Sequence, residues 1–347
     1  MIRKLLLGLI LLLVPLGAQA DAQRMEAVRY ARYGSPDVLK VVNVRAPNVR
    51  KGFVRVRVHA AGVNTIDSKM RQGGPFTGFP YPPPIIPGYD FSGVIDAVGK
   101  DVKGFSVGDA VFGMLPLTTP GAYAEYVVVD ARVIAHKPEG VSHTIAAALP
   151  MPALTAAQAL FGTAKLKAGQ TILIHGAAGG VGHIALQMAK ASGARVIATG
   201  SSGRRDFLIG LGADQFVDYT AQPFEQVVRD VDAVLDTVGG DTLKRSYGVL
   251  KPGGIVVSLV DEPDNGELRR RSVRGETILV EPNGQTLEVV ARELAAGRLR
   301  VAIEQVFPLA AAATAHRRNE TRRVQGRLVL SLLPDEASDE AGGAPRP

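Results

Sequence analysis

The 347-residue chain is long enough for two folded domains, and its 46% hydrophobic content excludes a wholly disordered protein. Aromatic residues make up 5% of the chain, tryptophan is absent and the net charge of +7 is modest for this length, so the composition favours no nucleic-acid partner. The chain has no cysteine, which excludes disulfides, thiolate zinc ligands and a cysteine nucleophile.

The N-terminal segment has the pattern of an export signal. Two basic residues precede an apolar run from Leu5 to Leu16, and Ala18-Gln19-Ala20 supplies the small residues of a cleavage site. The apolar run is shorter than the roughly twenty residues that a membrane-spanning helix needs, so no stable membrane span is expected. We therefore predict a signal peptide over residues 1–20 and a periplasmic or secreted protein. Alternatively, Met25 is the true start and the protein is cytoplasmic.

Residues 25–145 have the pattern of a β-rich domain. Val54-Arg55-Val56-Arg57-Val58 alternates apolar and charged side chains, as a half-buried strand does. Glycines recur among short Val, Ile, Phe and Tyr runs such as residues 124–129, which is typical of a compact barrel with tight corners. The sequence therefore predicts a β-barrel in this region.

In residues 146–274, helical stretches alternate with short apolar strands. The candidate strands are Thr171–His175, Arg195–Thr199, Ala233–Asp236 and Gly254–Ser258. Strands separated by helices form right-handed parallel crossovers, so this region predicts a doubly wound parallel sheet and an α/β fold.

Strand-like patterns return in residues 275–333, at Thr277–Val280 and at Arg327–Leu330. A helix is predicted between them, from Thr286 to about Ala296. We expect this region to complete the first domain. The tail, residues 334–347, is acidic and then rich in Gly and Pro, and is predicted to be disordered.

A glycine-rich loop at residues 175–182, His-Gly-Ala-Ala-Gly-Gly-Val-Gly, is the most informative segment of the chain. It lies between a predicted strand and a predicted helix, Val181–Ala191, where the backbone can approach a pyrophosphate that the helix N-terminus stabilises. Ala177 takes the first position of the usual Gly-x-Gly-x-x-Gly pattern, and Gly179 and Gly182 take the other two. The loop predicts a dinucleotide cofactor; a tight turn without a ligand is the alternative.

The end of the second predicted strand indicates which cofactor is preferred. Sites for NAD usually place an acidic residue there, to bind the ribose 2′-hydroxyl. This chain instead has Thr199-Gly200-Ser201-Ser202-Gly203-Arg204-Arg205, whose hydroxyl and guanidinium groups suit a 2′-phosphate. NADPH is therefore the predicted cofactor, against the alternative that these arginines are solvated charges at a helix start.

Between Met25 and about Leu332 the chain resembles the zinc-free medium-chain dehydrogenases/reductases, the quinone oxidoreductase and enone reductase group. Besides the glycine-rich loop, the resemblance is carried by Gly62–Asp67, Pro87–Gly93, Val107–Gly113, Leu154–Ala156, Leu211–Asp214, Asp236–Gly240 and Gly326–Val329. It implies a GroES-like catalytic barrel at 25–145 and 275–333, a Rossmann domain at 146–274, a cofactor cleft between them and a homodimer.

The resemblance also bears on the chemistry. Zinc-dependent members carry a cysteine ligand and a Gly-His-Glu motif where this chain has Gly88-Tyr89-Asp90, so no metal site is expected. Without a metal to polarise an alcohol, reduction of an activated acceptor is the better interpretation. Quinones and α,β-unsaturated carbonyls accept a hydride readily because the resulting oxyanion is delocalised. The sequence does not choose between these two substrate classes.

The resemblance also assigns residues to the cleft. Asn64 and Asp67 match the family's Asn-x-x-Asp element as the candidate catalytic residues, with a helix-cap role as the alternative for Asp67. The remaining residues are expected at the cofactor: Thr155 beside the nicotinamide, Gly179, Gly180 and Val181 at the pyrophosphate, Ser201, Arg204 and Tyr219 near the 2′-phosphate, and Val238 and Leu259 flanking the cofactor.

The chain departs from the family just after Asn64 and Asp67. Several relatives have tyrosines there, whereas residues 68–76 of this chain contain none, and Lys69 is either a proton donor or a solvated side chain. The six histidines have neither ligand spacing nor an evident serine and aspartate partner, so we predict no hydrolase triad. The missing tyrosine leaves a competing hypothesis, a non-catalytic NADPH-binding structural or sensing module.

Overall fold

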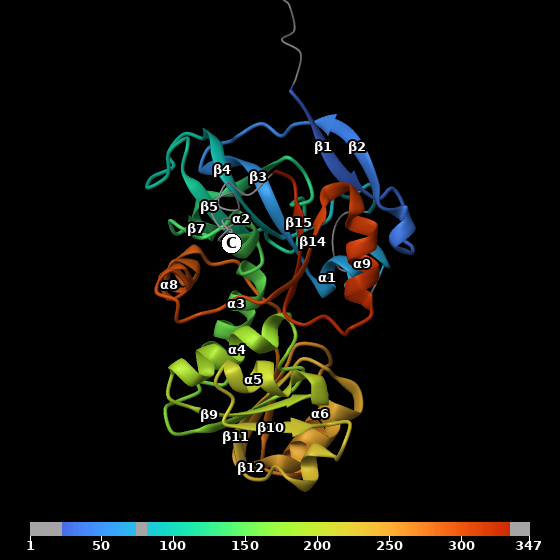
Figure 1. Cartoon of the computed structure of the whole chain (residues 1–347), viewed down its shortest axis with the longest axis vertical. Helices are drawn as coiled ribbons and strands as arrows, with labels where there is room; N and C mark the ends of the chain where they lie inside the picture. Colours follow the sequence, from blue (N-terminus) through green and yellow to red (C-terminus); the bar gives the residue numbers. More distant parts are fainter. Residues whose placement is uncertain (1–22, 74–81, 334–347) are drawn as a thin grey trace, which may run out of the picture.

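The computed structural model describes residues 23–73 and 82–333, which form two domains joined at a waist (Figure 1). The upper domain in that view carries a seven-stranded sheet, and the lower domain carries a six-stranded sheet. We call them the barrel domain and the parallel-sheet domain. The predicted signal peptide, residues 1–20, and the predicted disordered tail, residues 334–347, lie outside the described residues.

The barrel domain is built around one long strand, β3 (Phe53–Val63). Along one edge, β3 pairs with β4 (Asp90–Val98). Along the other edge, its first half pairs with β6 (Tyr126–Asp130) and its end pairs with β15 (Arg327–Ser331). Because β3 serves two neighbours on one edge, the sheet curls toward a barrel. The other strands of this domain are β5 (Ala110–Met114), β7 (Ile134–His136) and β14 (Ile303–Pro308), with a separate antiparallel pair of β1 (Arg24–Arg29) and β2 (Lys40–Arg45).

Helices from both ends of the chain cover the barrel domain. The first and last described helices, α1 (Thr65–Arg71) and α9 (Ala312–Glu320), pack against each other, and α8 (Gly284–Ala295) packs on β7. The short helix α2 (His143–Ala147) lies against β3 and β4, and α3 (Pro150–Ala157) leads into the waist. Among the described residues, every helix is too short or too polar to cross a membrane.

The parallel-sheet domain confirms the predicted doubly wound sheet. Its strand order is β10-β9-β8-β11-β12-β13, and all of its pairings are parallel. This is the 3-2-1-4-5-6 order of a dinucleotide-binding sheet, whose ligands lie at the carboxyl ends of the strands. The elements are β8 (Thr171–Ile174), α4 (Gly180–Ala191), β9 (Arg195–Gly200), α5 (Arg205–Gly210), β10 (Gln215–Asp218), β11 (Val231–Asp236), α6 (Gly240–Ser246), β12 (Leu250–Ser258), α7 (Asn265–Arg270) and β13 (Arg274–Thr277).

The last strand of this sheet corrects the sequence prediction. We predicted a strand at Thr277–Val280, at the start of the returning barrel domain. The strand instead spans Arg274–Thr277 and pairs with β12, so the parallel sheet extends beyond the predicted boundary at residue 274. The difference has a physical reason, because β13 is an edge strand and keeps mostly exposed polar residues that lack an apolar pattern.

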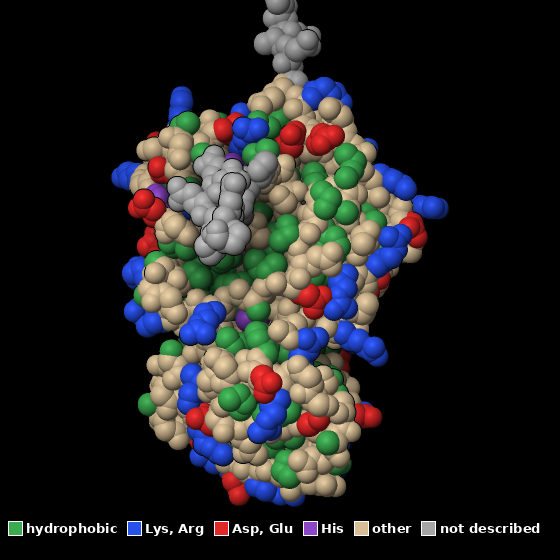
Figure 2. Space-filling view, in the orientation of Figure 1, with side chains coloured by type: hydrophobic (Ala, Val, Ile, Leu, Met, Phe, Trp, Pro, Cys, Tyr) green, Lys and Arg blue, Asp and Glu red, His purple; other side chains and the backbone are tan. Residues whose placement is uncertain are grey.

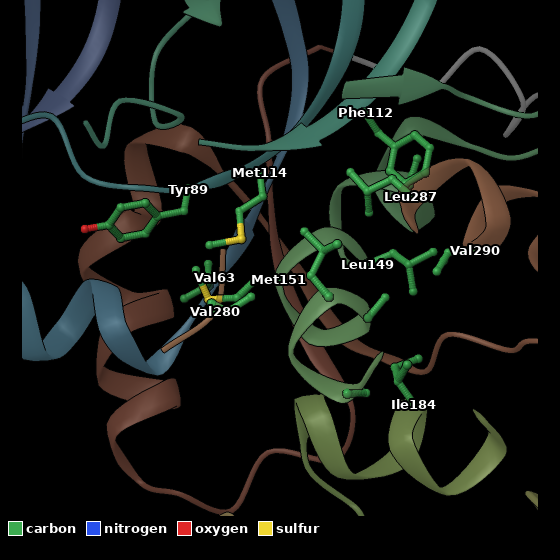
Figure 3. Close-up of a cluster of buried hydrophobic side chains, with 14 of the residues drawn as sticks. Val63, Tyr89, Phe112, Met114, Leu149, Met151, Ile184, Val280, Leu287 and Val290 are labelled. Carbon is green, nitrogen blue, oxygen red and sulfur yellow. The ribbon is translucent and has the colours of Figure 1, made fainter. Parts of the chain in front are cut away.

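One buried hydrophobic cluster connects the two domains (Figure 3). It contains Phe112 and Met114 from β5, Leu149 and Met151 at the start of α3, and Ile184 from α4. Helices α3 and α4 pack against each other within this cluster, so the waist is part of a shared core. Apolar burial contributes about 25 cal/mol per Å² of area removed from water, which favours one fixed placement of the domains.

Candidate active site

The glycine-rich loop joins β8 to α4 in a turn that only small residues can form. Gly176 has φ of +63°, in the left-handed region that favours glycine. A Cβ atom on Gly182 would lie 2.3 Å from the carbonyl oxygen of Gly176, so the start of α4 packs directly on the preceding turn. The loop thus brings the helix N-terminus close to the carboxyl end of the central strand β8.

The first turn of α4 offers free backbone donors. Its N-cap residue is Gly179, and no side chain of the described residues caps the helix there. The amide of His183 donates to the carbonyl of Gly179, which leaves the amides of Gly180, Val181 and Gly182 at the helix start. Such donors, together with the positive end of the helix dipole, suit the pyrophosphate of a dinucleotide.

A buried arginine from the barrel domain faces this turn. Arg327 is 5% exposed; its Nε donates to the carbonyl of Ala148 at 2.8 Å, and its Nη2 lies 3.1 Å from Asp90 Oδ2. Its Nη1 makes no hydrogen bond to a described residue and lies 3.0 Å from the point that a Cβ atom on Gly180 would occupy. This free guanidinium nitrogen lies beside the glycine-rich loop and the uncapped start of α4. It is a second feature that suits a pyrophosphate. The sequence analysis places Arg327 within the family segment Gly326–Val329 and predicts no role for its side chain.

Asp90 connects this arginine to the predicted catalytic element. Its Oδ2 also accepts a hydrogen bond from Asn64 Nδ2 at 3.0 Å, and its Oδ1 accepts one from the amide of Met151 at 2.8 Å. Burial raises the pKa of Asp90 to about 6, and Arg327 opposes that increase. Asn64 is therefore held by an acidic residue whose other partner, Arg327, faces the glycine-rich loop.

Asp67 occupies the helix-cap position that we gave as its alternative role. Its Oδ2 accepts hydrogen bonds from the amide of Asn64 at 2.7 Å and from the hydroxyl of Tyr123 at 3.1 Å, whereas its Oδ1 has no partner among the described residues. Burial, with a smaller contribution from Asp90, raises the pKa of Asp67 to about 7. The carboxyl group thus stabilises the start of α1.

A tyrosine does reach this region, although residues 68–76, just after Asp67, contain none. Tyr123 is fully buried and reaches Asp67 from a distant part of the chain. Its hydroxyl also lies 3.3 Å from Nε2 of His316, whose Nδ1 lies 3.3 Å from both Ser68 Oγ and Arg71 Nε. Sequence spacing could not reveal this tyrosine, because its partners are dispersed along the chain.

The residues predicted near the adenosine lie together at the carboxyl ends of β9 and β10. Ser201 follows β9 directly, and Arg204 ends the following short 3₁₀ turn. The amide of Tyr219, at the end of β10, donates to the carbonyl of Gly200 at 3.2 Å. The Arg204 guanidinium contacts Gln325 and the carbonyl of Arg323, both from the barrel domain.

The remaining predicted residues lie on or next to four elements. Val238 and Leu259 follow the adjacent strands β11 and β12. Asp236 holds both segments: its side chain accepts a hydrogen bond from the amide of Val238, and its backbone carbonyl accepts one from the amide of Leu259. Thr155 is buried on α3 in the waist, and Lys69 is half-buried on α1. Hydrophobic side chains gather just above this waist, with basic side chains beside it (Figure 2).

The comparisons with known proteins agree with this architecture. Residues 50–139 match the model described as alcohol dehydrogenase GroES-like domain, and residues 211–330 match the one described as zinc-binding dehydrogenase. The chain is 36% identical over 321 residues to the 2-methylene-furan-3-one reductase of Solanum lycopersicum, covering 89% of this chain and 80% of that protein. The chain belongs to the medium-chain dehydrogenase/reductase superfamily. It is therefore an oxidoreductase.

Solved structures of this superfamily are similar over most of the chain. The structure of the quinone oxidoreductase from Coxiella burnetii has a TM-score of 0.85 and 37% identity, covering 89% of this chain and 100% of that chain. The Escherichia coli quinone oxidoreductase complexed with NADPH has a TM-score of 0.80 and 29% identity, covering 88% of this chain and 99% of that one. The GroES-like and Rossmann fold class predicted from the sequence is confirmed.

Zinc is named in the description of one matching model, but the residues here do not fit it. The chain has no cysteine, and Tyr89, whose hydroxyl donates to the carbonyl of Leu117, stands at the position of the histidine in the Gly-His-Glu motif. Across residues 23–73 and 82–333, no three His, Asp or Glu side chains are grouped so that they could hold a metal. We derive no catalytic step through zinc.

Replacing Arg327 with Met should lower the free energy of unfolding by about 3–5 kcal/mol, because Asp90 would keep a buried charge without its partner. Arg298→Met is the matched control, since its ion pair with Glu293 lies on the surface and contributes about 1 kcal/mol or less. Urea unfolding of both variants provides the measurement. Equal losses would contradict a special role for the buried pair.

Asp67 should make the protein less stable as the pH rises. Its pKa in the folded state, about 7, lies above the unfolded value of about 3.9, so its stabilising contribution is present below pH 4 and is lost as the pH approaches 7. Asp67→Asn removes this titration and keeps an oxygen that can accept from Asn64 and Tyr123. The stability of the wild type relative to the variant should therefore decrease between about pH 4 and pH 7. A difference that is constant over this range would refute the assignment.

Proposed function

We propose that this protein is an NADPH-dependent, zinc-independent reductase that transfers a hydride to a quinone or an α,β-unsaturated carbonyl compound. The observation that carries the proposal is the free Nη1 of buried Arg327, which faces the uncapped start of α4 in a dinucleotide-binding sheet. The relatives named above as a quinone oxidoreductase and a 2-methylene-furan-3-one reductase support these two acceptor classes.

The preference for NADPH is supported by the charges at the end of β9. Arg204 lies there with the Ser201 hydroxyl, and the exposed Tyr219 ring lies at the end of the neighbouring strand. No carboxylate occupies residues 199–205, where NAD-binding sites place one. The Escherichia coli relative complexed with NADPH supports the same choice.

The bound cofactor would supply the hydride from C4 of its nicotinamide. The chain's own contribution is orientation. Thr155 and Val238 would fix the nicotinamide end of the cleft, and the Asn64 amide, held by Asp90, would orient the cofactor or acceptor. Asp67 supports Asn64 through the backbone amide of that residue, which makes Asp67 a positioning residue in this proposal. Lys69, half-buried on α1, is a candidate proton donor to the reduced acceptor.

The test follows the absorbance of the reduced nicotinamide while the protein is mixed with NADPH or NADH and a panel of quinones, 2-enals and enones. Turnover with NADPH supports the reductase, and the preferred acceptor chooses the substrate class. Tight binding of NADPH with no oxidation by any acceptor would overturn the proposal in favour of a non-catalytic NADPH-binding module.

Arg204→Ala should raise KM for NADPH about tenfold or more, because a hydrogen bond between charged groups contributes roughly 1.5–3 kcal/mol. The kinetic constants for NADH should change little, since NADH lacks the 2′-phosphate. Steady-state kinetics with one acceptor and both cofactors measure the difference. Equal effects on the two cofactors would remove the assignment of Arg204 to the 2′-phosphate.

Two features outside the cleft complete the proposal. We propose export through the signal peptide at residues 1–20, which N-terminal sequencing of the mature protein tests; a start at Met25 would indicate a cytoplasmic enzyme.

We also propose a homodimer. Strand β13 ends the parallel sheet and pairs on one side only among the described strands, which leaves an edge that a second copy could extend. Light scattering tests the dimer.

A further inference from the structure

One short segment of the barrel domain, residues 321–327, reaches both phosphate sites of the proposed cofactor cleft. At one end, the amide of Gly326 donates to the carbonyl of Ala178 in the glycine-rich loop at 2.8 Å, and Arg327 follows it. At the other end, Gln325 Oε1 and the carbonyl oxygen of Arg323 accept hydrogen bonds from Arg204, the latter at 3.1 Å. The proposed 2′-phosphate arginine is thus held by the opposite domain.

The acceptors that hold Arg204 are uncharged. A carboxylate bonded directly to the guanidinium would pair with its charge, whereas a side-chain amide and a backbone carbonyl fix its direction and form no ion pair with it. The nearby carboxylate of Glu304, which interacts electrostatically with Arg204, forms its ion pair with Arg318. A guanidinium has five N–H donors, and these two contacts leave others free for a ligand. An arginine side chain at a protein surface otherwise loses up to about 2 kcal/mol of rotamer entropy when a ligand immobilises it. Because the contact with Gln325 already restricts the rotamers of Arg204 before a ligand binds, part of this entropy cost is no longer incurred on binding.

Gln325 is itself fixed in place. The backbone amide of Gln325 donates to Glu304 Oε2 at 2.7 Å. The other oxygen of that carboxylate, Oε1, accepts from Arg318 Nε at 2.6 Å. Arg318, on α9, also donates to Thr321 Oγ1 at 2.9 Å, which connects the start of the segment to that helix. The amide side chain therefore projects toward Arg204 from a supported backbone.

We propose that Gln325 is a specificity-determining residue, which orients Arg204 for the 2′-phosphate and makes the protein select NADPH over NADH. This inference rests on the proposed function. In this proposal both domains contribute to the 2′-phosphate site. Arg204 of the parallel-sheet domain binds the phosphate, and Gln325 of the barrel domain keeps Arg204 in the orientation that selects NADPH.

The test compares Gln325→Met, Arg204→Ala and the double variant in steady-state kinetics with one acceptor and both cofactors. Met keeps the size of Gln but cannot accept the hydrogen bond. Gln325→Met should raise KM for NADPH about fivefold, the factor that one hydrogen bond of ordinary strength contributes, and leave kcat and the constants for NADH within twofold. In the Arg204→Ala background, Gln325→Met should have no further effect. Gln285→Met, an exposed change on α8 away from Arg204, is the control.

A second measurement does not depend on turnover. Calorimetric titration with adenosine 2′,5′-bisphosphate should show the same fivefold loss of affinity in Gln325→Met, whereas binding of adenosine 5′-monophosphate should be unchanged. Equal losses for both nucleotides, or a Gln325→Met effect that persists without Arg204, would overturn the inference. If Arg204→Ala itself leaves NADPH binding unchanged, the cofactor assignment fails; if only Gln325→Met has no effect, the role of Gln325 alone fails.

Discussion

The buried ion pair between Asp90 and Arg327 connects the barrel, the waist and the phosphate loop. Asp90 begins β4 and Arg327 begins β15, and both strands pair with β3. A charge left alone in such a position is strongly destabilising, so the pair requires both strands to be in register on β3. The remaining bonds of the pair go to the carbonyl of Ala148 and the amide of Met151, where the chain leaves the barrel for the parallel sheet. One interaction thus fixes the barrel and the entry to the waist.

The same pair also determines the electrostatics around Asn64 and the start of α1. Two buried carboxyl groups, Asp67 and Asp90, share the field of Arg327, and burial raises the pKa of both. An anion bound at the free Nη1 of Arg327 would compete with these carboxyl groups for the same positive charge, which favours their protonated forms. Binding of the proposed cofactor and protonation of Asp67 would thereby be linked, because both sites would share one guanidinium.

The sequence could predict what depends on neighbouring residues. The apolar runs of β8, β9, β11 and β12 and the glycines before α4 are local patterns, and the structure contains each of them. It could not predict contacts between distant residues, such as Arg327 with Asp90, 237 positions apart, or Arg204 with Gln325, 121 positions apart. A signal for the first did exist, because an arginine and an aspartate at the starts of apolar strands must find partners if they are buried. Nothing in the sequence marks Gln325, since a surface glutamine has no such requirement.

Arg327 and Arg204 would serve the two phosphate sites of the proposed cofactor in different ways. Arg327 is buried and balanced by Asp90, so its contribution at the pyrophosphate is a directed hydrogen bond added to the donors of α4. Arg204 is partly exposed and its hydrogen-bond acceptors are neutral, so its contribution is a charge that no directly bonded carboxylate neutralises. The pyrophosphate is common to NADH and NADPH, so hydrogen-bond donors at that site bind both cofactors. Discrimination between NADPH and NADH requires a charge that interacts with the 2′-phosphate alone. Neutral contacts such as that of Gln325 preserve this charge, and a salt bridge at the same place would remove it.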